Sequence, residues 1–404
     1  MSKLKKILFI GLMAWAQNAC HSSQILTPTT AAEGGQLLQM RVDGDNLYVA
    51  YVNEDGDEMC YWFRPTMDNE LFTFHRVGYR RASGTMPNAA NITETSGITW
   101  LNKTTSDNIG PLNMQKGGWV GGNHLDDGKR TAVTRSVKIF ADGKEITASR
   151  GTINCSKVTI DVVNAILDPT SAAGAGGLFT TTMLTEAVRY EVARNAIDVT
   201  VTHTFASGAR NRIYGYYGMQ SMFYMEDKVM TPHGKYNDFT PIGQIASFKL
   251  GDYPKFDRFI EMNSSTGWCQ ASHLLRDGIG DHRYVKDTNE VFVTSTYGKN
   301  YHMLIRGLNA TGGTSYSWHG VYSWFRPREN NANVLVYSSV LNGEGVLYVD
   351  VKRACDVTFP LPSHWQKRGK AVKVLQADDG IGIHIEKASR VHVSAARSGT
   401  AILE

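Results

Sequence analysis

Two short runs early in the chain predict its fold class. Gln36-Leu-Leu-Gln-Met-Arg-Val42 and Asn46-Leu-Tyr-Val-Ala-Tyr-Val52 flank the pair Asp43-Gly44. Both runs have the apolar and aromatic composition of β-strands. The Asp-Gly pair suits the positive backbone angles of a tight hairpin turn. The stretch therefore predicts an antiparallel β-hairpin.

The same pattern continues along the chain, with further Asp-Gly pairs at Asp55-Gly56, Asp142-Gly143 and Asp379-Gly380. One run, Thr182–Asn195, fits a strand and an amphipathic helix equally well. We therefore expect an all-β protein, whose residues 24–330 form a large, mostly antiparallel β-sandwich. The other expected strands in this range are Glu58–Arg64, Glu70–Val77, Ala132–Phe140, Thr152–Leu167, Ala196–Phe205, Glu290–Thr296, Tyr301–Arg306 and Thr314–Phe325.

The end of the chain, residues 331–404, also reads as strands, such as Val334–Val340 and Gly345–Val351. It has few glycine-rich loops and no crowded cluster of polar residues. We expect these strands to be structural, either as part of the sandwich or as a smaller C-terminal β-sheet joined near Arg326–Asn331.

The composition limits the classes of function. The 404 residues are 42% hydrophobic and 20% charged, so the chain can bury a large core. A net charge of +4 is nearly balanced, and no lysine/arginine block follows the N-terminus, which excludes the usual footprint of nucleic-acid binding. The 18 Tyr, 8 Trp and 15 Phe residues suit packing on a sheet, and they also supply flat surfaces for sugar rings.

Residues 1–20 have the features of a targeting segment, with a lysine-rich start and the short apolar run Ile7–Trp15. Two cleavage sites compete. Ala14-Trp-Ala16 fits an ordinary secretory cut, whereas Gln17-Asn-Ala-Cys20 resembles a lipobox with Cys20 as the lipid-bearing residue. We expect export, to the outer membrane as a lipoprotein or to the periplasm or medium, with membrane contact only through such an N-terminal lipid anchor.

Without Cys20, four cysteines are left: Cys60, Cys155, Cys269 and Cys355. In an exported protein they allow two disulfides, and four buried free thiols fit equally well. No C-x-x-C pair occurs, so neither a zinc knuckle nor a redox motif is indicated.

The segment Lys116–Arg130 is the first candidate for a functional site. Four glycines within six residues make its backbone pliable and let a ligand approach the main chain closely. The alternative is a glycine-rich turn with a solvated polar tip. The segment matches no known pattern of metal ligands, so we expect no metal. Its polar and aromatic residues are Trp119, Asn123, His124, Asp126, Asp127, Lys129 and Arg130.

A second candidate is the run Arg212-Ile-Tyr-Gly-Tyr-Tyr-Gly-Met-Gln220. Strict alternation along a strand places Arg212, Tyr214, Tyr216 and Gln220 on one face, with a glycine leaving room between them. Such a face suits the floor of a polar cleft. The alternative is a set of exposed tyrosines lying on the surface of a sheet.

The chemistry that these residues allow is acid–base work on a sugar. The sequence contains no G-x-G-x-x-G, G-x-x-x-x-G-K-[ST], H-E-x-x-H or G-x-S-x-G motif, so we expect no cofactor. Hydrolysis requires two carboxylates across the scissile bond. β-Elimination from a uronic acid requires a group that neutralises the carboxylate, a base and an acid. The inventory of the two candidate stretches fits elimination better.

This combination resembles exported Bacteroidetes-type polysaccharide-degrading lipoproteins, and its residue types are similar to those of β-sandwich polysaccharide lyases. The resemblance implies β-elimination of a uronic-acid-containing polysaccharide. A glycoside hydrolase and a non-catalytic surface glycan-binding protein are the alternatives. The implied catalytic residues are His124 with Tyr214 or Tyr216, and the implied substrate-binding residues are Trp119, Asn123, Arg130, Arg212 and Gln220.

Overall fold

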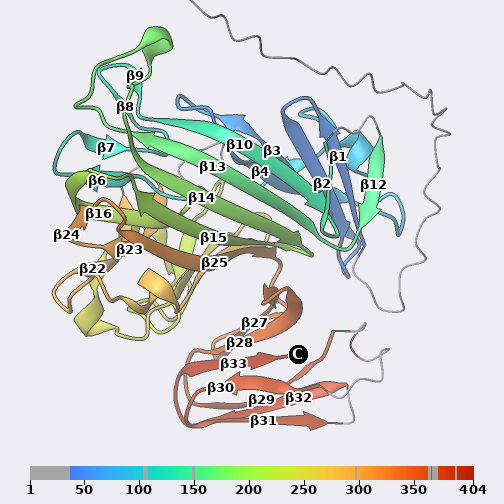
Figure 1. Cartoon of the computed structure of the whole chain (residues 1–404). Coiled ribbons are helices and arrows are strands. Elements are labelled where there is room, and N and C mark those ends of the chain that lie inside the picture. The colour runs from blue at the N-terminus through green and yellow to red at the C-terminus, as the bar shows by residue number, and fades with distance from the viewer. Residues whose placement is uncertain are drawn as a thin grey trace, which may run out of the picture.

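The computed structural model describes residues 37–102, 108–147, 151–295, 298–362, 365, 372–386 and 389–404 (Figure 1). The expected targeting segment 1–20 and Cys20 therefore lie outside the described residues. The structure is all-β and built from antiparallel sheets, as predicted. Among the described residues, no helix is long and apolar enough to cross a membrane.

A six-stranded sheet contains the hairpin predicted at the start of the chain, because β1 and β2 pair from Leu38↔Tyr51 to Asp43↔Asn46. The order of its strands is β12-β1-β2-β3-β4-β5. Their bounds are β1 (Leu38–Asp43), β2 (Asn46–Val52), β3 (Asp57–Thr66), β4 (Leu71–Arg81), β5 (Thr99–Trp100) and β12 (Thr152–Cys155).

A ten-stranded sheet runs beside it in the order β11-β10-β13-β14-β15-β25-β21-β20-β17-β18. The ambiguous run Thr182–Asn195 is the strand β14, in which buried Glu186, Val188 and Tyr190 alternate with exposed neighbours. The bounds are β10 (Ala132–Ala141), β11 (Lys144–Glu145), β13 (Val158–Leu167), β14 (Thr182–Ala193), β15 (Ala196–Phe205), β17 (Lys228–Met230), β18 (Thr240–Pro241), β20 (Arg258–Asn263), β21 (Trp268–Leu275) and β25 (Ser315–Phe325).

A seven-stranded sheet in the order β19-β22-β23-β16-β6-β7, with β24 also paired to β16, completes the main sandwich. Its strands are β6 (Leu112–Met114), β7 (Gly118–Val120), β16 (Arg210–Ser221), β19 (Phe248–Lys249), β22 (Glu290–Ser295), β23 (Lys299–Ile305) and β24 (Leu308–Thr311). The remaining elements here are the ribbon of β8 (Leu125–Asp126) and β9 (Lys129–Arg130), and the 3-10 turns η1 (Ala89–Asn91), η2 (Ala175–Gly177), η3 (Ile242–Gln244), η4 (Leu250–Asp252) and η5 (Gly278–Asp281).

Aromatic rings fill the core between the six-stranded and ten-stranded sheets. Phe74 of β4 has its ring centroid 5.2 Å from that of Tyr322 and 6.1 Å from that of Trp324. Phe63 of β3 contacts Tyr190 of β14 at 5.6 Å. These edge-to-face contacts among fully buried rings join the two sheets into one body.

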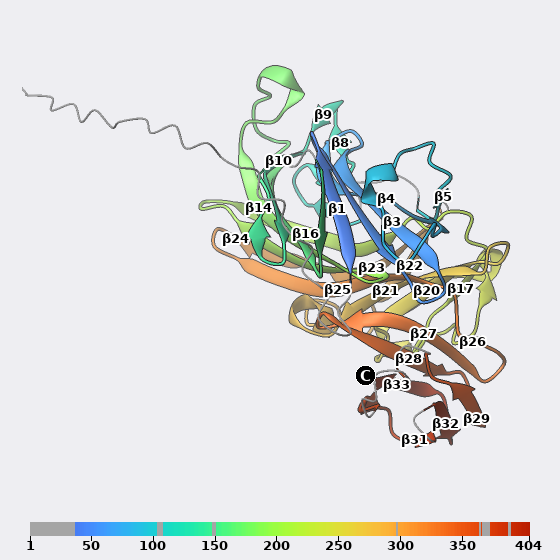
Figure 2. The same ribbon diagram turned by 90° about the vertical axis from the view of Figure 1, so that its right-hand side faces the viewer.

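The C-terminal strands form a smaller sandwich of their own, seen at the end of the main sandwich in Figures 1 and 2. Its core includes Val336, Val349, Phe359 and Val393. One sheet has the order β26-β27-β28-β33-β30 and the other β29-β32-β31. The bounds are β26 (Glu329–Asn330), β27 (Val334–Leu341), β28 (Glu344–Val351), β29 (Cys355–Pro360), β30 (Val374–Ala377), β31 (Ile381–Glu386), β32 (Arg390–Ala395) and β33 (Gly399–Leu403).

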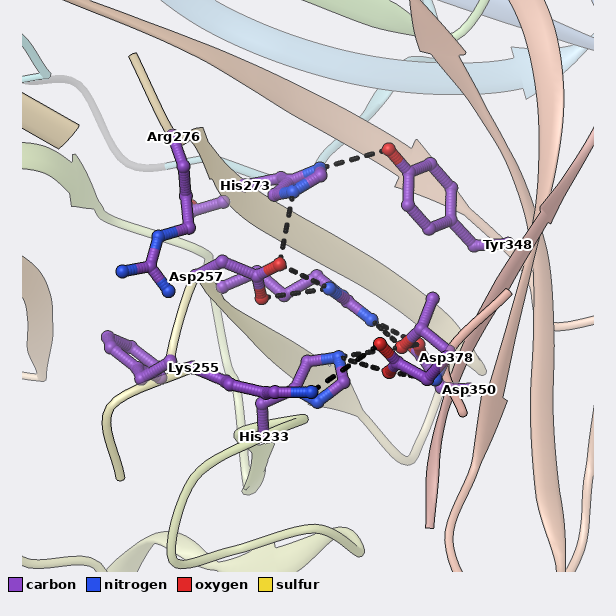
Figure 3. Close-up of polar contacts among 12 residues, drawn as sticks. His233, Lys255, Asp257, His273, Arg276, Tyr348, Asp350 and Asp378 are labelled. Atoms are coloured by element: carbon purple, nitrogen blue, oxygen red, sulfur yellow. Dashed lines mark hydrogen bonds and ion pairs between the residues drawn. The ribbon is translucent and has the colours of Figure 1, made fainter. Parts of the chain in front are cut away.

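A buried ionic network joins the two sandwiches (Figure 3). Arg258 of β20, only 1% exposed, donates hydrogen bonds to Asp257 at 2.8 Å, to Asp350 of β28, and to Thr400 of β33 at 2.6 Å. Beside it, the Tyr348 hydroxyl is 3.1 Å from Nδ1 of His273. A buried charge is tolerated only when it is paired in this way, so the network fixes how the sandwiches dock.

The four cysteines that the structure describes are free thiols. Cys60, Cys155 and Cys269 are buried and Cys355 is partly buried, so the option of two disulfides does not hold for this structure. Burial raises the pKa of the Cys60 thiol to about 12, which leaves it protonated and unreactive.

Candidate functional site

The glycine-rich segment lies against the strand that carries the second candidate stretch. Its first part forms β7, which pairs with the preceding strand β6, and β6 pairs with β16 through Leu112↔Tyr216 and Asn113↔Gly215. The segment then turns sharply at Gly121 and Gly122, whose φ angles of 75° and 49° favour glycine. Two stretches about ninety residues apart are thereby brought together on the seven-stranded sheet.

Four aromatic rings form a continuous series on this sheet, and we call them the ring row: His124, Trp119, Tyr217 and Tyr301. The centroid distances are 5.4 Å between His124 and Trp119, 5.3 Å between Trp119 and Tyr217, and 5.5 Å between Tyr217 and Tyr301. All four side chains are partly exposed. The indole of Trp119 thus links the imidazole of the pliable segment to a phenol of β16.

Two arginines and a further tyrosine lie beside the ring row. A Cβ atom placed on Gly215 would be 3.2 Å from the Tyr217 ring and 3.5 Å from a guanidinium nitrogen of Arg306. A Cβ on Gly307 would be 3.1 Å from the guanidinium of Arg212. Tyr214 is 45% exposed. Glycine at both positions leaves room for the arginine side chains, so cations, phenols and an imidazole gather on one part of the surface.

The sequence predicted that Tyr216 lies on the same face of β16 as Arg212 and Tyr214, and this prediction is wrong. Its pairing to β6 shifts between Ile213 and Gly215, and its pairing to β23 shifts between Tyr216 and Tyr217. Because a one-residue shift exchanges the two faces of a strand, Tyr217 faces outward and Tyr216 inward. The Tyr216 hydroxyl is fully buried, donates to the Ile109 carbonyl at 2.8 Å and accepts from Trp318 at 2.8 Å. Burial raises the pKa of this phenol well above its usual value.

Three other predicted site residues do not belong to the ring row. Gln220 is fully buried in β16. The Asn123 side-chain oxygen accepts a hydrogen bond from the Asp68 backbone at 2.8 Å, and Arg130 pairs with Glu70 at 2.6 Å. Asn123 and Arg130 therefore attach the glycine-rich segment to the β3–β4 turn.

That turn is held most firmly by Asn69, which is fully buried. Its side-chain nitrogen donates to the carbonyls of Gly122 at 2.8 Å and His124 at 3.0 Å, while its oxygen accepts from the Thr131 backbone at 3.1 Å. One amide thus fixes the backbone of His124 to the tip of the β3–β4 hairpin.

The outer side of the same hairpin carries a feature that the sequence did not reveal. Two hollows of about 610 Å³ and 660 Å³ adjoin there, because both are lined by Asp45, Asn46, Pro65 and Glu70. His75 and Arg64 line the first hollow, whereas the second extends along β10. We call this continuous hollow the His75 groove.

His75 occupies a β-bulge, since Trp62 pairs with Arg76 and Phe63 with Phe74. The side chain is 7% exposed, and neither ring nitrogen has a hydrogen-bond partner among the described residues. Burial, followed by the nearby charges of Arg64 and Arg76, lowers the pKa of His75 to about 4. The sequence showed only a strand here, and no motif announces the bulge.

No protein-family model matches the chain, and no curated protein matches its sequence. Among solved structures, it is similar to the galactosidase domain of an α-galactosidase–sucrose kinase (TM-score 0.40, 9% identity, 71% of this chain and 42% of that one). The α-galactosidase of Lactobacillus brevis gives a TM-score of 0.40 with 10% identity over 71% of this chain and 40% of that one. A polysaccharide lyase gives 0.27 with 8% identity over 90% and 45%.

The chain thus spans about two-fifths of the length of these galactosidases. By their names, the matched proteins act on carbohydrates. With TM-scores below 0.5, these similarities carry no argument about the activity of this chain.

Proposed function

We propose that the protein is a polysaccharide lyase that cleaves a uronic-acid-containing glycan by β-elimination, with the ring row as its substrate face. One observation carries the proposal: Trp119 contacts both His124 and Tyr217, at centroid distances of 5.4 Å and 5.3 Å. An imidazole and a phenol are therefore both in contact with one partly exposed indole.

Each requirement of β-elimination has a candidate group on this surface. Arg306 and Arg212 bind the uronate carboxylate and stabilise the negative charge that develops when the neighbouring C–H bond breaks. His124 takes that proton as the base. The electron pair forms a carbon–carbon double bond, the bond to the glycosidic oxygen breaks, and Tyr217 or Tyr214 gives a proton to the leaving oxygen. Tyr217 replaces the buried Tyr216 in this role.

A hydrolase is supported less well by the same surface. The nearest acidic pair in sequence is Asp126 and Asp127. Asp127 is ion-paired with Lys129 at 2.7 Å, and the hydrogen bond from Lys129 lowers the pKa of this carboxyl. A carboxylate held in its charged form is a poor general acid, which hydrolysis requires.

A glycan-binding protein without catalysis is the second candidate. The ring row favours it, because four partly exposed rings in series can stack successive sugars whether or not a proton moves.

One assay separates these functions. The purified protein is incubated with polygalacturonate, alginate and glycosaminoglycans, and both ultraviolet absorbance and reducing ends are followed. A lyase produces both signals because elimination creates a conjugated double bond. Reducing ends without absorbance identify a hydrolase. Binding with neither signal identifies a glycan-binding protein and rejects the enzyme.

Export through residues 1–20 and lipid attachment at Cys20 belong to the same proposal, because an enzyme that cleaves a polysaccharide outside the cell must be exported. Metabolic labelling with a palmitate analogue tests the anchor. Label that persists in Cys20→Ala rejects this residue as the attachment site, whereas export of an unlabelled wild-type protein indicates the ordinary secretory cut.

A further inference from the structure

We infer that the His75 groove is a second binding site, which takes the oxyanion groups of an extended acidic sugar chain. This inference does not require that the ring row is catalytic. It rests on three observations: a weakly neutralised arginine in the groove with a second one near it, a buried histidine without a hydrogen-bond partner among the described residues, and two exposed cations further along the groove.

The arginine pair is organised by Trp62 on the outer face of the six-stranded sheet. The guanidinium carbon of Arg64 lies 5.6 Å from the centroid of the indole ring and that of Arg76 lies 6.0 Å from it. The ring is fixed by its hydrogen bond from Nε1 to Asn46 at 2.9 Å. Two cations are thus held against one aromatic side chain, an arrangement in which their positions are set before a ligand arrives.

The charge of this pair is poorly neutralised within the described part of the chain. Arg76 approaches Glu94 only to 3.8 Å, and Glu94 is largely exposed. Arg64 donates to the carbonyl of its neighbour Pro65 at 3.2 Å and forms no ion pair with a described carboxylate. A carboxylate or sulfate entering here would gain charge-assisted hydrogen bonds without displacing a strong internal partner.

His75 supplies the second observation. A buried imidazole whose nitrogens both lack a partner among the described residues is costly, and water or a ligand in the hollow would complete its hydrogen bonding. The charged groups that face it are Arg64 on β3 and Arg76 on β4, while Asp45 and Glu70 line the hollow. The bulge in β4 turns this side chain toward the two arginines, as bulges often do near functional sites.

The groove continues along β10, where two further cations are among its lining residues, which favours a chain over a free ion. Asp45, Glu70 and Glu145 line the same hollow, and Glu70 is paired with Arg130. Arg135 and Lys138 of β10 line the second hollow, are exposed, and form no ion pair with the described residues. Arg135 stands at an irregularity in the pairing of β10 with β13. Each hollow falls within the range of about 300–1,000 Å³ that is usual for small-molecule sites.

Binding in this groove should be linked to protonation. The arginines help to hold His75 neutral, and an anion bound beside Arg64 offsets part of their charge, so the pKa of His75 rises in the complex. The complex then takes up a proton as the pH falls from the ordinary histidine range toward 4. The affinity for an anion therefore increases as the pH falls over this interval. The titration of the uronate carboxylate itself does not account for this increase.

The test is a titration of the full protein with trigalacturonate, a sulfated chondroitin tetrasaccharide and inorganic sulfate, each followed by calorimetry and by the NMR signal of His75. The His75 signal is assigned with a His75→Asn variant. We expect at least one oligosaccharide to raise the pKa of His75, and Arg64→Gln to weaken that binding about tenfold. Preference for the trimer indicates carboxylate recognition, and preference for the tetrasaccharide indicates recognition of sulfate esters.

The matched control is Arg212→Gln, which removes an arginine beside the ring row and should leave the His75 response unchanged. Near-ultraviolet circular dichroism establishes that both variants are folded. The inference is overturned if no oligosaccharide moves the His75 signal, if Arg212→Gln abolishes the response while Arg64→Gln does not, or if inorganic sulfate binds as tightly as the oligosaccharides. Absence of cleavage by the unmodified protein, with the His75 response intact, would count against the ring row as a catalytic site and leave the His75 groove standing.

Discussion

The ring row and the His75 groove differ in the signal that they leave in the sequence. The ring row joins residues that are far apart in sequence, and its chemistry is displayed by residue types in a glycine-rich segment. The groove also joins distant segments, but its histidine lies in a β-bulge between β3 and β4, within a run that reads as an ordinary strand. The comparison teaches that a site on a pliable loop leaves a signal in sequence, whereas a site that depends on an irregular strand pair leaves almost none.

The largest expected effect is a loss of turnover when the ring row is altered, which would assign catalysis to the ring row and not to the His75 groove. Replacing His124 with Ala should lower the turnover of a uronate polymer by about 10²–10⁴-fold, the usual contribution of a general base. The initial rate of absorbance increase measures it. His392→Ala is the matched control, since this partly exposed histidine lies in the C-terminal sandwich and pairs with Asp356. Unchanged turnover in the His124 variant would remove the ring row from catalysis.

Variants of Tyr216 and Tyr217 test which of these neighbouring residues of β16 faces outward. Tyr217→Phe should lower turnover by about tenfold or more and leave stability nearly unchanged, because the phenol is partly exposed. Tyr216→Phe should instead lower the free energy of unfolding by about 1–3 kcal/mol, because the Trp318 N–H loses its buried acceptor. Urea denaturation and the absorbance assay are both needed. The reverse pattern would restore the original assignment of Tyr216 to the substrate face.

Cutting the link between the two regions should affect both stability and turnover. Asn69→Ala leaves the carbonyls of Gly122 and His124 and the Thr131 N–H without their amide partner. We expect a loss of about 1–3 kcal/mol in the free energy of unfolding and a smaller fall in turnover than for His124→Ala. Asn102→Ala, at another buried amide, controls for stability alone.

The groove should reveal itself through the pH dependence of stability. Burial lowers the pKa of His75 to about 4 and that of His302 to about 3, so the folded protein resists protonation that the unfolded chain undergoes near 6.5. The free energy of unfolding therefore falls as the pH drops from 6.5 to about 4. His75→Phe should make this slope shallower by up to about 1.4 kcal/mol per pH unit. An unchanged slope would show that His75 is not held neutral.

Much of the fold follows from the sequence because alternation and turn residues are local signals. The hairpin at Asp43-Gly44 and the strand β10 lie close to where the pattern places them. The Thr182–Ala193 strand could not be separated from a helix, since only the neighbouring β13 and β15 settle it. Tertiary pairing decides what local preference leaves open.

The candidate site at the ring row was predictable in part, because residue types are also a local signal. Trp119, His124, Arg212 and Tyr214 were identified by residue type, and β6 brings their two stretches together. The choice of Tyr216 failed because the ladder of β16 shifts, and alternation cannot foresee a shift. Arg130 was taken for a ligand-binding cation because its partner Glu70 lies sixty positions earlier.

The amide of Asn69 has a consequence for how the molecule responds to a load. It stands at the tip of the hairpin whose strands bear Arg64 and His75, and it grips the backbone at His124. A displacement of this tip is transmitted to the backbone of His124 through the Asn69 side chain, and the contacts of Asn123 with Asp68 and of Arg130 with Glu70 act in parallel. The β3–β4 hairpin and the glycine-rich segment should therefore move together, with the Asn69 side chain as a connection between them.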